Sequence, residues 1–136
     1  MRAVLDPNVL ISAVLSRGGT PAALVRAWLA GAYELVVSPA LLDELERVLG
    51  YPKIASRVPH AQARELVELL RNRADQVADP DTVPAIHSPD PDDDYLIALA
   101  ADSRAVLVSG DTHLHGLTGQ LPVYTPVAFS SLLAGD

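Results

Sequence analysis

The chain has 136 residues with ten basic and 17 acidic side chains, and its net charge of −7 argues against a protein that coats nucleic acid. Because the sequence has no cysteine, disulfides and thiolate metal sites are excluded, and any metal must bind to oxygen atoms or imidazoles. No apolar run approaches the roughly 18 residues that span a bilayer, and the N-terminus lacks a basic region followed by a long apolar one. We therefore expect one domain over residues 1–136, in the cytoplasm and with no membrane contact.

The first half of the chain alternates apolar runs with helical repeats. Residues 2–5 form a short apolar run that ends at Asp6, which is typical of a buried strand in a parallel sheet. Residues 34–37 form a second such run. The predicted helices of this half cover residues 9–15, 22–32 and 39–49. Thr20 and Ser38, each followed by proline, are the expected N-caps of the second and third helices.

After a break at residues 50–52, a helical hairpin is predicted, which contains Ile54 and Val58 and then a longer helix at residues 61–77. This arm is basic, because residues 47–73 hold six basic side chains against two acidic ones. Residues 75–111 instead hold nine carboxylates against one arginine, so an anionic substrate could lie beside a metal. The remaining predicted elements are an edge strand at 83–86, a helix at 95–101, strands at 105–109 and 121–124, and a helix at 127–133. Alternating strands and helices without tight hairpins predict a mostly parallel sheet covered on both faces.

Acidic residues recur where this fold would bring them together. Asp6 and Asp111 each follow a predicted strand, the cluster Asp90 to Asp94 precedes a predicted helix, and both Glu44 and Glu46 lie on the margins of an apolar helix stripe. The carboxyl ends of parallel strands share one edge of the sheet, so we expect these groups to converge there. Converging carboxylates favour a hard cation such as Mg²⁺, whose chemistry suits phosphodiester hydrolysis.

Each of these residues also has a purely structural interpretation. Asp6 could cap the following helix, one residue of the acidic cluster could be an N-cap, and Asp111 could cap a short helix at 112–116. The two glutamates could be solvated flanks, and helical periodicity does not choose between them. His113 and His115 have His-x-His spacing, but without a third ligand nearby in the sequence we expect no zinc site there.

Together these motifs resemble the PIN domain family of metal-dependent nucleases, especially its small bacterial toxin-type, VapC-like members. The resemblance covers nearly the whole chain and rests on Val4 to Ser12, Ser38 to Leu45, Asp90 to Ala100, and Val108 to Asp111. It implies a three-layer α/β/α sandwich with a central, mostly parallel sheet of four to five strands. It also implies an endoribonuclease that uses Mg²⁺ or Mn²⁺, and hence an RNA substrate, an antitoxin partner and a homodimer.

The resemblance also assigns roles by position. The metal-binding and catalytic residues that it implies are Asp6, Glu44, Asp94 and Asp111, with Asp93 as a substitute for Asp94. The residues that it implies in support of them are Asn8 and Ser109. On the basic arm, Lys53 and Arg57 are the candidate contacts for substrate phosphates.

One departure from the family pattern keeps other functions open. The family's usual threonine after the first aspartate is Pro7 here, which removes a hydroxyl and a backbone donor near the site. A binding module without catalysis is therefore the main alternative. A phosphatase that uses Asp6 as nucleophile is the second, although the amide of Asn8 is unable to serve as its proton donor.

Overall fold

A parallel sheet of five strands forms the centre of the computed structural model, which describes residues 1–81, 94–115 and 122–135. The strands are β1 (Arg2–Leu5), β2 (Glu34–Val37), β3 (Asp75–Gln76), β4 (Val106–Val108) and β5 (Val123–Tyr124). Their order in the sheet is β3-β2-β1-β4-β5, and every neighbouring pair is parallel. Leu5 of β1 pairs with Val108 of β4, so the next residues, Asp6 and Ser109, lie side by side at the carboxyl edge of the sheet.

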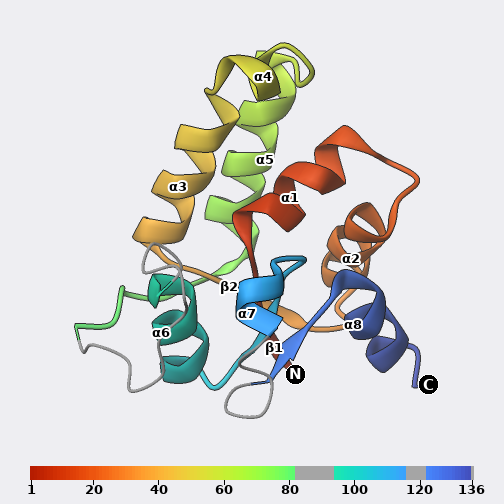
Figure 1. Ribbon diagram of the computed structural model, residues 1–136, viewed down its shortest axis with the longest axis vertical. Helices are drawn as coiled ribbons and strands as arrows, with labels where there is room; N and C mark the ends of the chain where they lie inside the picture. Colours follow the sequence, from red (N-terminus) through yellow and green to blue (C-terminus); the bar gives the residue numbers. More distant parts are fainter. Residues whose placement is uncertain (82–93, 116–121, 136) are drawn as a thin grey trace.

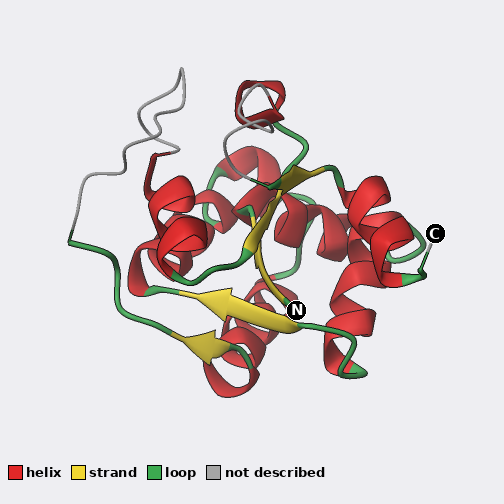
Figure 2. Cartoon of the chain, turned by 90° about the horizontal axis from the view of Figure 1, so that it is seen from below, coloured by secondary structure: helices red, strands yellow, loops and turns green. Residues whose placement is uncertain are grey.

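Helices pack on both sides of the sheet, so the predicted three-layer α/β/α fold is confirmed (Figure 1, Figure 2). They are α1 (Pro7–Leu15), α2 (Thr20–Leu29), α3 (Pro39–Leu49), α4 (Pro52–Ala55), α5 (His60–Arg73), α6 (Asp94–Asp102), α7 (Thr112–His115) and α8 (Pro126–Leu133). In Figure 1, α6 lies on one side of the strands and α2 and α8 lie on the other. Helices α3 and α5 run side by side as an arm that ends at α4.

The central strands are buried on both faces because helices cover them. Ala3, Val4 and Leu5 of β1 have no exposed surface, and neither has Leu107 of β4. Ile97 of α6 is equally buried, as expected for a helix that packs against β1 and β4. No helix in the described part of the chain is long and apolar enough to cross a membrane.

The helix starts follow the predicted capping pairs, with one exception. Ser38 and Thr125 accept hydrogen bonds from the backbone N–H groups of Leu41 and Ala128, at 3.3 and 3.0 Å. Thr20 was expected to be the N-cap of the second helix, but the helix begins at this residue. Gly19 is the N-cap and makes no side-chain hydrogen bond.

The helix predicted at 61–77 was wrong at its end, because α5 stops at Arg73 and the chain then joins the sheet. Ala74 is extended, and β3 pairs with Val36 and Val37 of β2. The Gln76 amide donates to the carbonyl of Leu70 at 2.9 Å and so completes the helix end. The edge strand predicted at 83–86 lies outside the described residues.

Candidate active site

Asp6 lies at the carboxyl end of β1, where the strand turns directly into α1. Its side chain is buried, with 5% of its surface exposed. The Oδ1 atom accepts a hydrogen bond from the backbone N–H of Asn8 at 2.9 Å, and Oδ2 accepts one from the Ser109 hydroxyl at 2.8 Å. Asp6 therefore does cap α1, yet each oxygen can still accept a further partner because a carboxylate oxygen has two lone-pair sites.

Pro7 does not deprive Asp6 of backbone support. It occupies the first turn of α1, where an N–H group would have no partner within the helix. The N–H group of Asn8, one residue further on, makes the bond to Asp6 instead. The side chain of Asn8 is exposed, so its observed contribution comes from the backbone.

Ser109 joins Asp6 to the segment after β4. It is fully buried, and its hydroxyl oxygen accepts a hydrogen bond from the N–H of Asp111 at 3.0 Å while its hydrogen goes to Asp6. His115 of α7 approaches the same residue, since its Nε2 lies 2.5 Å from the Ser109 carbonyl oxygen and donates to it. From the sequence, His115 was considered only as a zinc ligand. A local signal is that the short helix α7 follows Asp111 directly, and its last residue, His115, bonds through its backbone N–H to the Asp111 carbonyl.

Two of the predicted carboxylates act electrostatically on a third, Asp6. Burial raises the pKa of the Asp6 carboxyl above its ordinary value, and the charges of Asp111 and Glu44 raise it further. The hydrogen bonds from Asn8 and Ser109 act in the opposite direction, because they stabilise the ionised form. The structure thus places Asp111 and Glu44 near enough to the carboxyl end of β1 for their charges to act on Asp6.

Glu44 and Glu46, which periodicity did not separate, turn to different neighbours. Glu44 is half-buried, and both of its carboxylate oxygens contact the guanidinium of Arg47 one helical turn later. Glu46 reaches across to α5 and pairs with Arg71 at 2.5 Å. Of the two, Glu44 is the one whose charge contributes to the raised pKa of Asp6.

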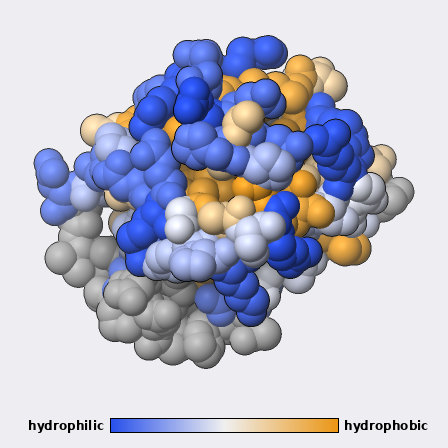
Figure 3. All heavy atoms as spheres, turned by 90° about the horizontal axis from the view of Figure 1, so that it is seen from above, coloured by the Kyte–Doolittle hydropathy of each residue, from blue (hydrophilic) through white to orange (hydrophobic). Residues whose placement is uncertain are grey.

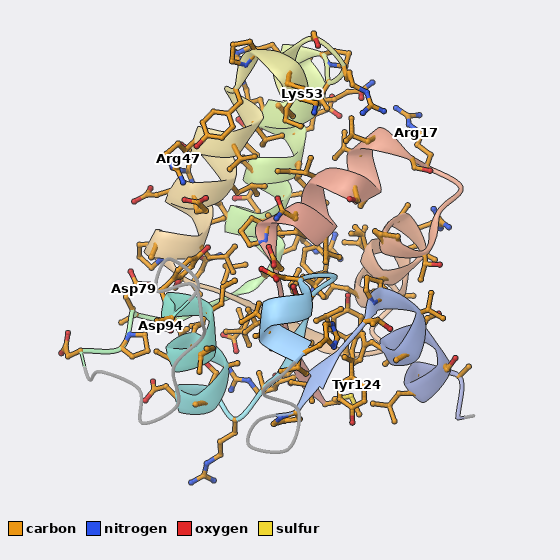
Figure 4. All side chains as sticks on the ribbon, viewed as in Figure 1. Arg17, Arg47, Lys53, Asp79, Asp94 and Tyr124 are labelled. Atoms are coloured by element: carbon orange, nitrogen blue, oxygen red, sulfur yellow. The ribbon has the colours of Figure 1, made fainter. Side chains whose placement is uncertain are left out.

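Asp94 is the first residue of α6 and is half-buried. Figure 4 shows it on the side of the molecule where α3 begins, near Asp79, whose carboxylate bonds to the N–H of Ala40 at 3.0 Å. Its role as a ligand stays a prediction, as does that of Asp93, which lies outside the described residues.

Lys53 and Arg57 are exposed at the free end of the arm. Figure 4 shows Lys53 at the top of the molecule, the end at which Arg17 also lies, away from the start of α1 where Asp6 is found. The structure does not bring these two basic residues into the acidic cluster, so any phosphate that they bind lies at a distance from it.

The donors at the carboxyl edge suit a hard divalent cation, since Asp6, Glu44 and Asp111 all offer oxygen and Mg²⁺ and Mn²⁺ prefer carboxylates. Within residues 1–81, 94–115 and 122–135, however, no three acidic or histidine side chains are close enough together to form a complete metal site. The guanidinium of Arg47 bonds to both oxygens of Glu44, one of the candidate ligands. The chemistry of the donors fits a cation, which would share the Glu44 oxygens with Arg47 or displace it.

Comparison with known proteins identifies the family. One similar chain comes from the crystal structure of VapBC2 from Rickettsia felis bound to a DNA fragment from the VapBC2 promoter. It superposes with a TM-score of 0.65 at 14% identity, over 92% of this chain and 98% of that one. A chain of VapBC-1 from nontypeable Haemophilus influenzae gives a TM-score of 0.62 at 19% identity, over 93% and 99%. No curated protein matches the sequence. The family model described as "PIN domain" matches residues 2–113, and the chain therefore belongs to the PIN domain family.

Proposed function

We propose that this protein is a metal-dependent endoribonuclease that hydrolyses RNA phosphodiester bonds, and that it is the VapC-like toxin of a toxin–antitoxin pair in the cytoplasm. Membership of the PIN domain family supports the nuclease activity. The two VapBC structures that share its fold support the pairing with an antitoxin.

The observation on which the activity chiefly rests is the environment of Asp6. A buried carboxylate with two further carboxylates near enough to raise its pKa is unfavourable for the folded protein by itself. A divalent cation would offset this repulsion. The neighbouring carboxylates are not needed for capping α1, so they favour a cation-binding role for Asp6. The hydrogen bonds from Asn8 and Ser109 hold the Asp6 carboxylate at the edge of the sheet.

We assign Asp6, Glu44, Asp94 and Asp111 as the residues that would hold Mg²⁺ or Mn²⁺, with Asp93 as the substitute for Asp94. When bound, such a cation lowers the pKa of a coordinated water and neutralises charge on a phosphate. Ser109 orients Asp6 through its hydroxyl and fixes the backbone of Asp111 through its oxygen.

The partners that we propose are an RNA substrate, an antitoxin and a second copy of the chain. Lys53 and Arg57 at the end of the arm would contact RNA phosphates away from the cleaved bond. A groove of about 240 Å³ between α1 and α5, lined partly by Val14, Leu66 and Leu69, provides apolar surface for a protein partner. Figure 3 shows apolar side chains at the surface of the face that bears the end of the arm, framed by hydrophilic ones.

The proposal is tested by incubating the purified protein with a mixed RNA pool in Mg²⁺, Mn²⁺ or EDTA, beside Asp6→Asn and Asp94→Asn. Cleavage should require metal and disappear in both variants. Asp43→Asn is the matched control, because Asp43 is an exposed carboxylate on the same helix as Glu44 and should leave cleavage intact.

Other outcomes would favour the alternatives. Metal binding that depends on Asp6, without cleavage of any RNA in the pool, would point to the non-catalytic binding module. A phosphorylated intermediate trapped on Asp6 would point to the phosphatase. Cleavage that survives in EDTA or in Asp6→Asn would overturn the proposed function outright.

A further inference from the structure

Arg47 binds Glu44, one of the predicted metal ligands. Its Nη2 atom lies 2.7 Å from Oε1 of Glu44 and 2.6 Å from Oε2, and its Nε atom lies 3.1 Å from Oε2. The guanidinium therefore engages both oxygens of the carboxylate at once. This geometry is the fork that arginine forms with carboxylates, and it is more specific than a single contact.

Tyr51 holds the guanidinium in this position. The Nη1 atom of Arg47 donates a hydrogen bond to the Tyr51 hydroxyl, and the guanidinium carbon lies 5.5 Å from the centre of the tyrosine ring. Tyr51 is the N-cap residue of α4, so its position is set by the junction between α3 and α4. The Arg47 guanidinium thus contacts both Glu44 and Tyr51.

Glu44 is shared between two neighbours, because its oxygens bond to Arg47 and its charge acts on Asp6. Figure 4 shows Arg47 on the flank of α3 that faces away from α1, whereas Asp6 caps the start of α1. A cation that bound both Asp6 and Glu44 would draw at least one Glu44 oxygen from Arg47 toward itself. That movement breaks or weakens the fork with Arg47.

We propose that Arg47 is an internal competitor for Glu44, which lowers the affinity of the acidic site for divalent cations until Glu44 is released. This inference rests on the proposed function, because it assumes that Glu44 belongs to the metal site. The site then has two arrangements: Glu44 on Arg47 without metal, and Glu44 turned toward Asp6 with metal. Arg47 acts through Glu44 and is a positioning residue, not a catalytic one.

Titration of the metal-free protein with Mn²⁺, followed by calorimetry, tests the competition. Since an exposed ion pair is modest in strength, we expect Arg47→Ala to bind Mn²⁺ roughly three- to fivefold more tightly than the wild type. Tyr51→Phe should move the affinity in the same direction by a smaller factor, because it loosens the anchor of Arg47 without removing its charge.

A matched control separates this competition from a general effect of charge. Arg71 forms a similar ion pair with Glu46 on the same helix, so Arg71→Ala removes one positive charge from the arm and leaves the contact between Arg47 and Glu44 intact. We expect its affinity for Mn²⁺ to stay within about twofold of the wild type. In a Glu44→Gln background, Arg47→Ala should not increase the affinity for Mn²⁺.

The outcomes distinguish this inference from the proposed function. If Mn²⁺ binding depends on Asp6 but Arg47→Ala binds no more tightly than the wild type, or gains as much in the Glu44→Gln background, the competition is refuted and the metal site stands. If neither the wild type nor Arg47→Ala binds Mn²⁺ in a manner that Asp6→Asn abolishes, both proposals fail.

Discussion

Replacing Ser109 with alanine removes one buried hydroxyl that holds two parts of the candidate site together. The variant loses the bond to Oδ2 of Asp6, at 2.8 Å, and the acceptor for the N–H of Asp111, at 3.0 Å. Ser109 has no exposed surface, so water has little access to replace these bonds. We expect Ser109→Ala to be less stable and to bind divalent cations more weakly.

The size of the loss follows from the two bonds. A hydrogen bond to a charged carboxylate contributes roughly 1.5–3 kcal/mol, and the bond from Asp111 adds about 1 kcal/mol. Together they predict a loss of about 2.5–4 kcal/mol in the free energy of unfolding. For a domain of this size, that corresponds to a fall of roughly 10–15 °C in the melting temperature.

The loss should also depend on pH. The hydrogen bond from Ser109 favours the ionised form of Asp6 and opposes the rise in its pKa that burial causes. Without Ser109 the folded-state pKa of Asp6 rises further, so more stability is lost as the pH rises through that value. The difference between wild type and Ser109→Ala should therefore be larger at neutral pH than in acid.

Thermal unfolding of metal-free protein at several pH values, with Ser38→Ala as control, is the assay. Ser38 is also a fully buried serine that follows a strand, but its hydroxyl only caps α3, which predicts a loss of about 1 kcal/mol and no effect on Mn²⁺ binding. If Ser109→Ala melts at the same temperature as Ser38→Ala and binds Mn²⁺ as the wild type does, the hydrogen bonds of Ser109 to Asp6 and Asp111 do not organise the site.

Three further predictions test the charge, the arm and the core. The pKa of Asp6 is raised in the folded state, so the folded protein loses stability as the pH rises above the pKa of an unfolded aspartate, about 3.9. Asp6→Asn should therefore raise the melting temperature of the metal-free protein at pH 7 but not near pH 3. Added Mg²⁺ should raise the melting temperature of the wild type only; equal shifts in both proteins would contradict this. The double variant Lys53→Ala, Arg57→Ala should bind RNA more weakly than the wild type in filter-binding assays at several salt concentrations. The slope of log affinity against log salt should fall by about 1 per lost phosphate contact. The control variant Arg26→Ala should change neither the affinity nor the slope. Phe129→Ala should cost about 3–5 kcal/mol in urea unfolding, with or without metal, because the ring is fully buried; a loss below about 1 kcal/mol would show that α8 is not part of the core.

Local sequence was sufficient to predict most elements, for identifiable reasons. The run Ala3 to Leu5 is apolar because both faces of β1 are covered, and proline after Ser38 and Thr125 marks helix starts that the structure confirms. Strand β3 was not predictable in this way. Asp75 and Gln76 are exposed and polar, and they form a strand only because the edge of β2 offers them backbone partners.

The alternation of apolar runs and helices was enough to predict that Asp6 and the segment after Val108 lie at the same edge of a parallel sheet, because β1 and β4 are parallel neighbours that end at Leu5 and Val108. Which other groups approach these residues depends on how the helices pack and cannot be inferred from the local pattern. Glu44 and Glu46 are equivalent in helical periodicity, but Glu44 is near enough to Asp6 to raise its pKa and Glu46 reaches Arg71 on another helix. The fork between Arg47 and Glu44 likewise depends on side-chain rotamers and on Tyr51, since spacing permits such a contact without requiring it.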